Sequence, residues 1–278
     1  MSLVFYDTET TGLKAPFDQI LQFAAIRTDS DLKEIERFEI RCRLLPHIVP
    51  SPGAMHVTGI TVAQLTDNAL PSHYEMIRAI RAKLVSWSPC TFLGYNSIDF
   101  DEHFFRQALY QTLHSPYLTN SDGNTRSDVM RAVKAAFLFA PDALVIPIGA
   151  RGQQTFKLDE VAPSNGCAHK HAHDAMADVE ATVYLSRLLL DRAPDVWSSA
   201  MRFSKKAGVI DFIENESVFS LSDFYFGNPY SWLVVMLGTN KANSSEHYVY
   251  NLEVDPSSLM KMRSDDLAAR LKATPNRS

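Results

Sequence analysis

The chain has 278 residues, of which 46% are hydrophobic, and its formal net charge is −5. This length and composition are typical of a folded protein with one large domain, or with one domain and a smaller companion. The negative charge argues against broad, nonspecific coating of nucleic acid, but it is compatible with a local groove. We expect no membrane association, because no apolar run approaches the roughly 20 residues that span a bilayer and the N-terminus lacks a signal-peptide pattern.

Three cysteines, Cys42, Cys90 and Cys167, lie far apart, and no C-x-x-C pair is present. This spacing predicts neither a disulfide framework nor a structural zinc site. We therefore expect reduced thiols and a cytoplasmic location.

Strand and helix patterns follow one another through the first two thirds of the sequence. Strands are predicted over residues 2–6, 19–29, 37–45 and 90–96. Helices are predicted over residues 61–67, 72–87, 101–113, 128–139, 157–166 and 173–192, with a turn-rich segment at 49–61 and a loop at 144–155. This order predicts an α/β domain, built on a mixed β-sheet flanked by helices, that extends to residue 195.

The composition changes in the last third of the chain. Residues 218–254 are rich in aromatic and β-branched side chains with turn signals between them, which predicts a small unit of two or three strands. Residues 265–273 predict a short closing helix. We therefore expect a second, β-rich region after the α/β domain.

Two acids lie at the end of the first predicted strand. Asp7 and Glu9 are two residues apart, so a strand points both carboxylates to one face. Such carboxylates repel each other and are costly to bury without partners. Two interpretations remain open: a strand end where both acids reach solvent or a basic side chain, and a metal site. The following Thr10-Thr11-Gly12 is compatible with a plain turn or with a backbone surface for a nucleotide.

Further acids occur at the starts of two later helices. Asp101 is placed to cap a helix or to serve as a ligand, and Asp99 competes for the second role. His173 and Asp178 are five residues apart, which is roughly 140° around a helix, so His173 must lie at or before the helix start. Asp178 lies among small apolar residues and needs a partner, either a cation or a basic side chain.

The order D-x-E, a distant acid after an apolar strand, and H-x4-D on a late helix resembles the DEDDh 3′→5′ exonuclease superfamily. Five segments further resemble bacterial exodeoxyribonuclease I: QFAAIRTDS (22–30), PGAMHVTGIT (52–61), LGYNSIDFDEH (93–103), DVMRA (128–132) and NGCAHKHAHDAMADVEAT (165–182). The resemblance covers residues 2–195 well and continues weakly beyond them. It implies an RNase H-like exonuclease domain over residues 1–195 and a partial SH3-like β-rich extension over residues 196–278.

The resemblance also implies a chemistry. Metal-dependent hydrolysis would act on single-stranded DNA from its 3′ end and release 5′-mononucleotides. Four acids would hold two Mg²⁺ ions, which Mn²⁺ can replace, and His173 would be the general base. Asp101 is preferred to Asp99 because it follows Phe100, as in the family's Phe-Asp step. The implied metal ligands are Asp7, Glu9, Asp101 and Asp178.

The implied substrate contacts include basic side chains for phosphates, aromatic rings for unpaired bases, and two residues at the end of the first strand. They are Glu9, Thr10, Arg106, Tyr117, Arg131, Phe156 and Lys157. Tyr117 and Phe156 are equally compatible with the core, and Arg131 with a surface charge. The histidines at positions 169, 171 and 173 are interpreted as a solvated loop rather than a transition-metal site.

The partners implied by the resemblance are single-stranded DNA 3′ ends and a single-stranded-DNA-binding protein, and we expect a monomer that acts in DNA repair. Family members are much longer, so we expect no helical arm and lower processivity. One alternative is a 3′→5′ exoribonuclease of the RNase T or oligoribonuclease kind. The motifs do not distinguish DNA from RNA, because enzymes recognise the 2′-hydroxyl of RNA by the shape of the pocket. Another is a non-catalytic nucleic-acid-binding module, against which the presence of all five DEDDh residues argues.

Overall fold

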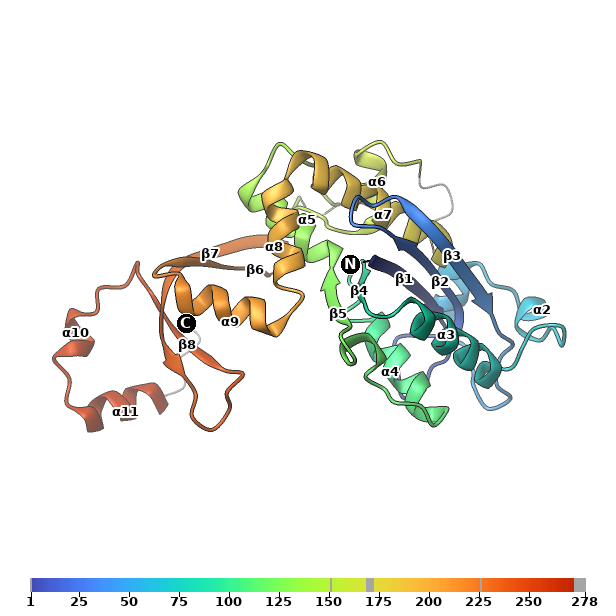
Figure 1. Cartoon of the computed structure of the whole chain (residues 1–278), viewed down its shortest axis with the longest axis horizontal. Helices are drawn as coiled ribbons and strands as arrows, with labels where there is room; N and C mark the ends of the chain where they lie inside the picture. The colour runs from blue at the N-terminus through green and yellow to red at the C-terminus, as the bar shows by residue number, and fades with distance from the viewer. Residues whose placement is uncertain (1, 151, 169–172, 226, 273–278) are drawn as a thin grey trace. The chain divides into compact units, whose positions relative to one another are not determined.

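A computed structural model of the chain describes residues 2–150, 152–168, 173–225 and 227–272 (Figure 1). The chain divides into two compact units, Met1–Val209 with Phe226–Asn228, and Ile210–Tyr225 with Pro229–Ser278. The domain boundary expected at residue 195 stays a prediction, because a compact unit and a domain need not end at the same residue.

A five-stranded mixed sheet forms the centre of the first unit, in the order β3-β2-β1-β4-β5. Its strands are β1 (Ser2–Thr10), β2 (Ile20–Thr28), β3 (Glu34–Arg41), β4 (Cys90–Gly94) and β5 (Thr125–Asp128). The β1–β2 and β2–β3 pairs are antiparallel, whereas β1–β4 and β4–β5 are parallel. The predicted fold class, an RNase H-like mixed sheet flanked by helices, is confirmed. The central position of β1 explains its apolar first half.

Helices pack on this sheet (Figure 1). Those of the first unit are α1 (Pro52–Thr58), α2 (Val62–Leu65), α3 (His73–Trp87), α4 (Asp101–Gln111), the 3₁₀ turn η1 (Leu118–Asn120), α5 (Val129–Phe139), α6 (Leu158–Ser164), α7 (Ala175–Arg192) and α8 (Pro194–Arg202). Apolar side chains of α3 and α4 form one core cluster with Tyr6, Phe23 and Phe92 of the sheet. Helix α7 packs on β1 and β2. Tyr6 and Asp7 point to alternate faces of β1, so Asp7 leaves the cluster that contains Tyr6.

The first unit differs from the sequence prediction in several features. Residues 49–61 were expected as turns, yet they include helix α1. The Ser51 side chain accepts a hydrogen bond from the Ala54 amide, Pro52 occupies the first turn, and Gly59 ends the helix with a left-handed φ of 65°. These residues are turn formers that also begin and end helices. The short strand β5 and the helix α8 were not predicted.

The second unit contains a three-stranded sheet in the order β6-β7-β8. Its strands are β6 (Phe219–Tyr225), β7 (Asn228–Thr239) and β8 (His247–Asn251), and the β7–β8 pair is antiparallel. Helix α9 (Lys206–Asn215) precedes this sheet, and α10 (Ser257–Met260) and α11 (Ser264–Lys272) follow it. The small β unit expected over residues 218–254 is therefore confirmed, with three strands. Among the described residues, no helix combines the length and the apolar character needed to cross a membrane.

Candidate active site

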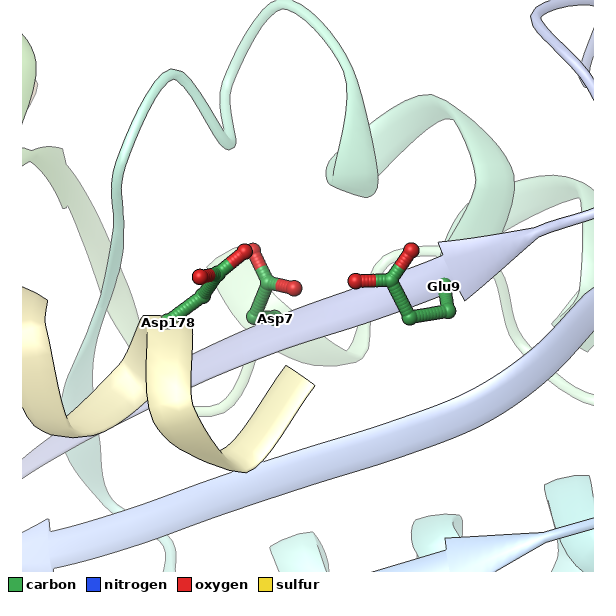
Figure 2. A group of neighbouring side chains, drawn as sticks. All are labelled: Asp7, Glu9 and Asp178. Atoms are coloured by element: carbon green, nitrogen blue, oxygen red, sulfur yellow. The ribbon is translucent and has the colours of Figure 1, made fainter. Parts of the chain in front are cut away.

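The acids at the end of β1 face the first turns of α7 (Figure 2). Asp7, Glu9 and Asp178 each offer one carboxylate oxygen, and these oxygens lie within 4.8 Å of one another. Glu9 is only 8% exposed, and the other two acids are half-buried. Residues 7 and 9 reach the same place because both point to one face of the strand, as the sequence predicted. Asp178 arrives from a helix that begins far away in sequence.

The start of α7 is fixed by a polar contact with the neighbouring strands. Asp174 caps the helix, since its carboxylate accepts a hydrogen bond from the Ala177 amide at 3.3 Å. The same carboxylate accepts from Arg41 at 2.7 Å and from Gln22 at 3.2 Å. His173 comes just before this cap, with a left-handed φ of 66° and an exposed side chain. The prediction that His173 precedes the helix is confirmed.

Asp101 is the first residue of α4 and binds back to β1. Its Oδ1 atom accepts hydrogen bonds from the Thr8 amide at 3.0 Å and from the Thr8 hydroxyl at 2.5 Å. Asp101 is 3% exposed, whereas Asp99 is exposed and pairs with Arg131 at 3.1 Å. Phe100, not Asp101, is the N-cap residue of α4, and it makes no side-chain capping bond. Of the two competing acids, Asp101 therefore lies with the acid cluster.

A pocket of about 460 Å³ lies over these residues. Its lining contains all five DEDDh residues: Asp7, Glu9, Asp101, His173 and Asp178. Apolar side chains from α1 and from the loop after β1 also line it, including Leu13, Ala54 and Val57. Leu13 is 83% exposed, so this apolar surface is available to a ligand.

Sequence reasoning did not identify these apolar lining residues. Val57 lies in the segment 49–61 that was interpreted as turn-rich, and Leu13 lies between two predicted strands; an isolated apolar residue in such a place carries little information. The signal that could have identified Val57 is its place inside the PGAMHVTGIT segment, which resembles exodeoxyribonuclease I. Tyr95, which follows β4, and Phe100, which precedes α4, also line the pocket and were not predicted.

The acids raise one another's pKa. Burial raises the pKa of Asp7 well above its ordinary value, and the charges of Asp101, Asp178 and Glu9 raise it further. Burial and the neighbouring acids raise the pKa of Glu9 to about 9. Burial also raises the pKa of Asp101 to about 7 and that of Asp178 to about 6. Such carboxylates take up protons unless a cation balances their charge.

Two of the predicted substrate contacts form a pair outside the acid pocket. The Arg106 Nε atom donates to Glu102 at 2.8 Å, and its guanidinium lies 5.4 Å from the centre of the Tyr117 ring. Tyr117 is 55% exposed, so one face of this pair is open to a ligand. Among the described residues, neither Arg106 nor Tyr117 lines the acid pocket, and their contact with DNA stays a prediction.

The remaining predicted contacts are distributed unevenly. Glu9 and Thr10 line the acid pocket, whereas Arg131, Phe156 and Lys157 do not belong to its described lining. Arg131 is held by the exposed Asp99, and Lys157 is exposed beside Glu160 at 3.4 Å.

Phe156 is 7% exposed and packs edge-on against Phe137, with ring centres 5.8 Å apart. This burial favours a packing role for its ring. Of the histidine cluster, His169 and His171 lie outside the described residues.

Comparison with known proteins agrees with this geometry. A family model described as "Exonuclease" matches residues 4–186 of the chain. The chain belongs to this exonuclease family. Exodeoxyribonuclease I of Escherichia coli K12 is 31% identical over 279 aligned residues, which cover 97% of this chain and 58% of that protein. The resemblance to exodeoxyribonuclease I inferred from the sequence is therefore confirmed.

Two solved structures of this exonuclease extend the comparison. Escherichia coli exonuclease I in complex with a dA16 oligonucleotide has a TM-score of 0.80 and 28% identity, over 100% of this chain and 60% of that chain. A zinc-ion-bound form of the same exonuclease with single-stranded DNA has a TM-score of 0.77 and 28% identity, over 99% of this chain and 59% of that chain. The chain thus spans about three fifths of the length of the relatives it matches.

Proposed function

We propose that the chain is a metal-dependent 3′→5′ exonuclease that acts on single-stranded DNA and releases 5′-mononucleotides. The observation that carries the proposal is the meeting of carboxylate oxygens from Asp7, Glu9 and Asp178 within 4.8 Å, under a pocket that Asp101 and His173 also line. Relatives solved with DNA oligonucleotides support DNA as the substrate.

The donor set fits hard divalent cations. Carboxylate oxygens are the ligands that Mg²⁺ and Mn²⁺ prefer, and histidine or cysteine would indicate softer metals. Burial and the repulsion of neighbouring acids raise the pKa of Glu9 to about 9, and a bound cation would offset both effects. We propose that Asp7, Glu9, Asp101 and Asp178 hold two Mg²⁺ ions. Such ions, when bound, polarise the phosphodiester and neutralise the charge that develops on its oxygens.

The remaining residues have roles that follow from their positions. His173 is exposed at the rim of the pocket, where its imidazole can accept a proton from an attacking water molecule. Glu9, Thr10 and the exposed Leu13 line the pocket and would contact the terminal nucleotide. Arg106 and Tyr117 would hold the strand further from its end, through a phosphate contact and base stacking.

The proposal includes a cytoplasmic location. Cys42, Cys90 and Cys167 are all free thiols, and the first two are buried. Free thiols in a chain without a disulfide support a reducing compartment. A monomeric state, a role in DNA repair and binding to a single-stranded-DNA-binding protein stay predictions.

The test is degradation of 5′-labelled single-stranded DNA and of RNA with the same sequence, each with Mg²⁺ or with EDTA. We expect DNA products that shorten from the 3′ end, release of 5′-mononucleotides, and no cleavage in EDTA. Preferential cleavage of RNA would assign the chain to the exoribonucleases. Binding without cleavage under any metal condition would show that the chain is a nucleic-acid-binding module.

A further inference from the structure

Glu102, the residue after Asp101, carries a buried carboxylate that accepts hydrogen bonds on both of its oxygens. It is 2% exposed. Its Oε2 atom accepts from the Tyr6 hydroxyl at 3.1 Å. Its Oε1 atom accepts from Arg106 at 2.8 Å, from Arg126 at 2.7 Å and from Thr119 at 2.6 Å. Because both oxygens accept hydrogen bonds from inside the protein and two of the donors are arginines, this carboxylate has its counter-charge without a metal ion.

Glu102 and Asp101 together attach the first turn of α4 to β1. Tyr6 and Thr8 are two residues apart and point to one face of that strand. Glu102 accepts from Tyr6, and Asp101 accepts from Thr8. Because Phe100 gives the helix no side-chain cap, these two carboxylates are the side-chain contacts that fix the helix start against the strand. The metal-ligand candidate Asp101 and the anchored Glu102 thus hold the same helical turn to the same strand.

The same carboxylate also orients the Arg106–Tyr117 pair. Arg106 lies one helical turn after Glu102, and its Nε–H points back to the Glu102 Oε1 atom. With this bond in place, the guanidinium carbon lies over the Tyr117 ring, 5.4 Å from the ring centre. Two separate parts of the proposed site, a metal ligand and a strand contact, thus share one buried anchor.

We propose that Glu102 is a positioning residue that orients Asp101 for metal binding and couples it to the Arg106–Tyr117 contact with the DNA strand. The proposal rests on the nuclease function proposed above and names how two parts of that site are connected. Loss of the Glu102 charge leaves two arginines without their shared counter-charge. Arg106 is then free to leave the Tyr117 ring, and the start of α4 is held less firmly.

Glu102→Gln is the sharpest test, because glutamine has the same shape. Its carbonyl can still accept from Arg106, Arg126 and Thr119, and its amide can donate to the Tyr6 oxygen, so the main change is the loss of charge. The matched control is Glu36→Gln, because Glu36 also accepts from a cation and an aromatic donor, Lys83 and Trp87. Glu36 lies on β3 and takes no part in the proposed site.

Two measurements separate positioning from general stability. The first is the increase in melting temperature on adding Mg²⁺ or Mn²⁺ without DNA, which reports metal binding to the folded chain. The second is kcat and KM on single-stranded DNA, measured well below the melting temperature. We expect Glu102→Gln to reduce the metal-induced increase in melting temperature, to lower kcat about tenfold and to raise KM several-fold. Loss of other residues that hydrogen-bond to and orient metal ligands has effects of this size. Glu36→Gln should leave all three near those of the unaltered chain.

Two milder variants keep the test valid if Glu102→Gln does not fold. Tyr6→Phe and Thr119→Val each remove one donor with little change in volume, and each should lower kcat a few-fold.

Arg106→Met should raise KM in the unaltered chain but much less in the Glu102→Gln background, because the same coupling is already lost.

The proposal is wrong if folded Glu102→Gln keeps its metal response, kcat and KM within twofold, or if the effects of Glu102→Gln and Arg106→Met simply add. It is also wrong if, with Glu102→Gln unfolded, Tyr6→Phe and Thr119→Val keep normal kinetics. Failure of the unaltered chain to cleave DNA would instead overturn the proposed function, and the metal response would still test the anchoring of Asp101.

Discussion

Asp101 and Glu102 are consecutive residues at the start of α4, and both are buried, yet their electrostatic surroundings differ. Glu102 accepts hydrogen bonds from two arginines, a tyrosine and a threonine. Asp101 accepts from Thr8 and lines a pocket with three further carboxylates. One acid has its counter-charge inside the protein, and the other lies among like charges. Two adjacent residues therefore have neighbours of opposite charge.

The contrast between Glu102 and Asp101 indicates which buried acid to assign to chemistry. A buried carboxylate that is matched by arginines is a structural element, and its removal exposes the arginines' charges. Carboxylates whose neighbours are mostly carboxylates have raised pKa values and are destabilising without a cation, which is typical of a metal site. Burial alone would not distinguish Glu102 from Asp101, whereas the sign of the neighbouring charges does.

Removal of a cluster acid is expected to give the largest effect. Asp7→Ala should lower kcat by at least about a thousandfold, since it removes a carboxylate at the centre of the cluster and with it the stabilisation of transition-state charge. The metal-free fold should persist or gain stability, because one repulsive buried charge is lost. Release of labelled mononucleotides and thermal unfolding in EDTA measure the two effects.

The matched control for this prediction is Asp191→Ala. Asp191 lies on α7, the helix that carries Asp178, and it is exposed near the other end. Its replacement should leave kcat unchanged. Near-normal turnover by Asp7→Ala would remove the distinction between the acid cluster and Glu102, because the cluster would then have no chemical role.

The sequence predicted most of the acid cluster and little of its support. The strand period puts Asp7 and Glu9 on one face, and helical geometry places His173 before the helix that carries Asp178. The resemblance to the DEDDh exonucleases then implied their roles and favoured Asp101 over Asp99. Glu102 was not singled out, because an acid in a first helical turn is common and its four donors come from four separate segments.

The sequence also predicted the central sheet of the fold but missed some shorter elements. Long apolar strands such as β1 and β2 carry a clear pattern, so the central sheet was found. Strand β5 has only the four residues TRSD, which do not alternate in hydrophobicity, and its pairing with β4 is set by tertiary contacts. Helix α1 was missed because Ser51, Pro52 and Gly59 signal turns as strongly as helix ends.

Without metal, the acid cluster should make the protein less stable as pH rises. An acid that is paired with arginines has the opposite effect. The pKa of Glu9 is raised to about 9, that of Asp101 to about 7 and that of Asp178 to about 6. Unfolded carboxyl groups titrate near about pH 4, so the folded chain binds more protons than the unfolded chain between about pH 4 and pH 9. Stability of the metal-free protein should therefore fall as pH rises through this window.

Thermal unfolding in EDTA at several pH values measures this slope. We expect the melting temperature to fall by at least about 5 °C between pH 5 and pH 9, which is on the order of 2 kcal/mol for a chain of this size. Excess Mg²⁺ should remove most of the fall, and Glu9→Gln should make it shallower in EDTA. A melting temperature that rises with pH in EDTA would mean that the cluster is internally compensated, as Glu102 is.

The smallest expected effect comes from Thr8, which gives Asp101 a neutral hydroxyl donor where Glu102 also has two arginines. Its hydrogen bonds to Asp101 lower the pKa of that carboxyl against the rise caused by burial. Thr8→Val keeps the side-chain shape but removes the hydroxyl, so Asp101 should be less ionised near neutral pH and bind metal more weakly. We expect the Mg²⁺ concentration for half-maximal activity to rise about fivefold at pH 6.5, on the order of 1 kcal/mol for one hydrogen bond to a charged group. The difference should shrink at pH 9, where Asp101 ionises in both proteins. An effect of equal size at both pH values would show that Thr8 acts on the geometry of Asp101 rather than on its charge.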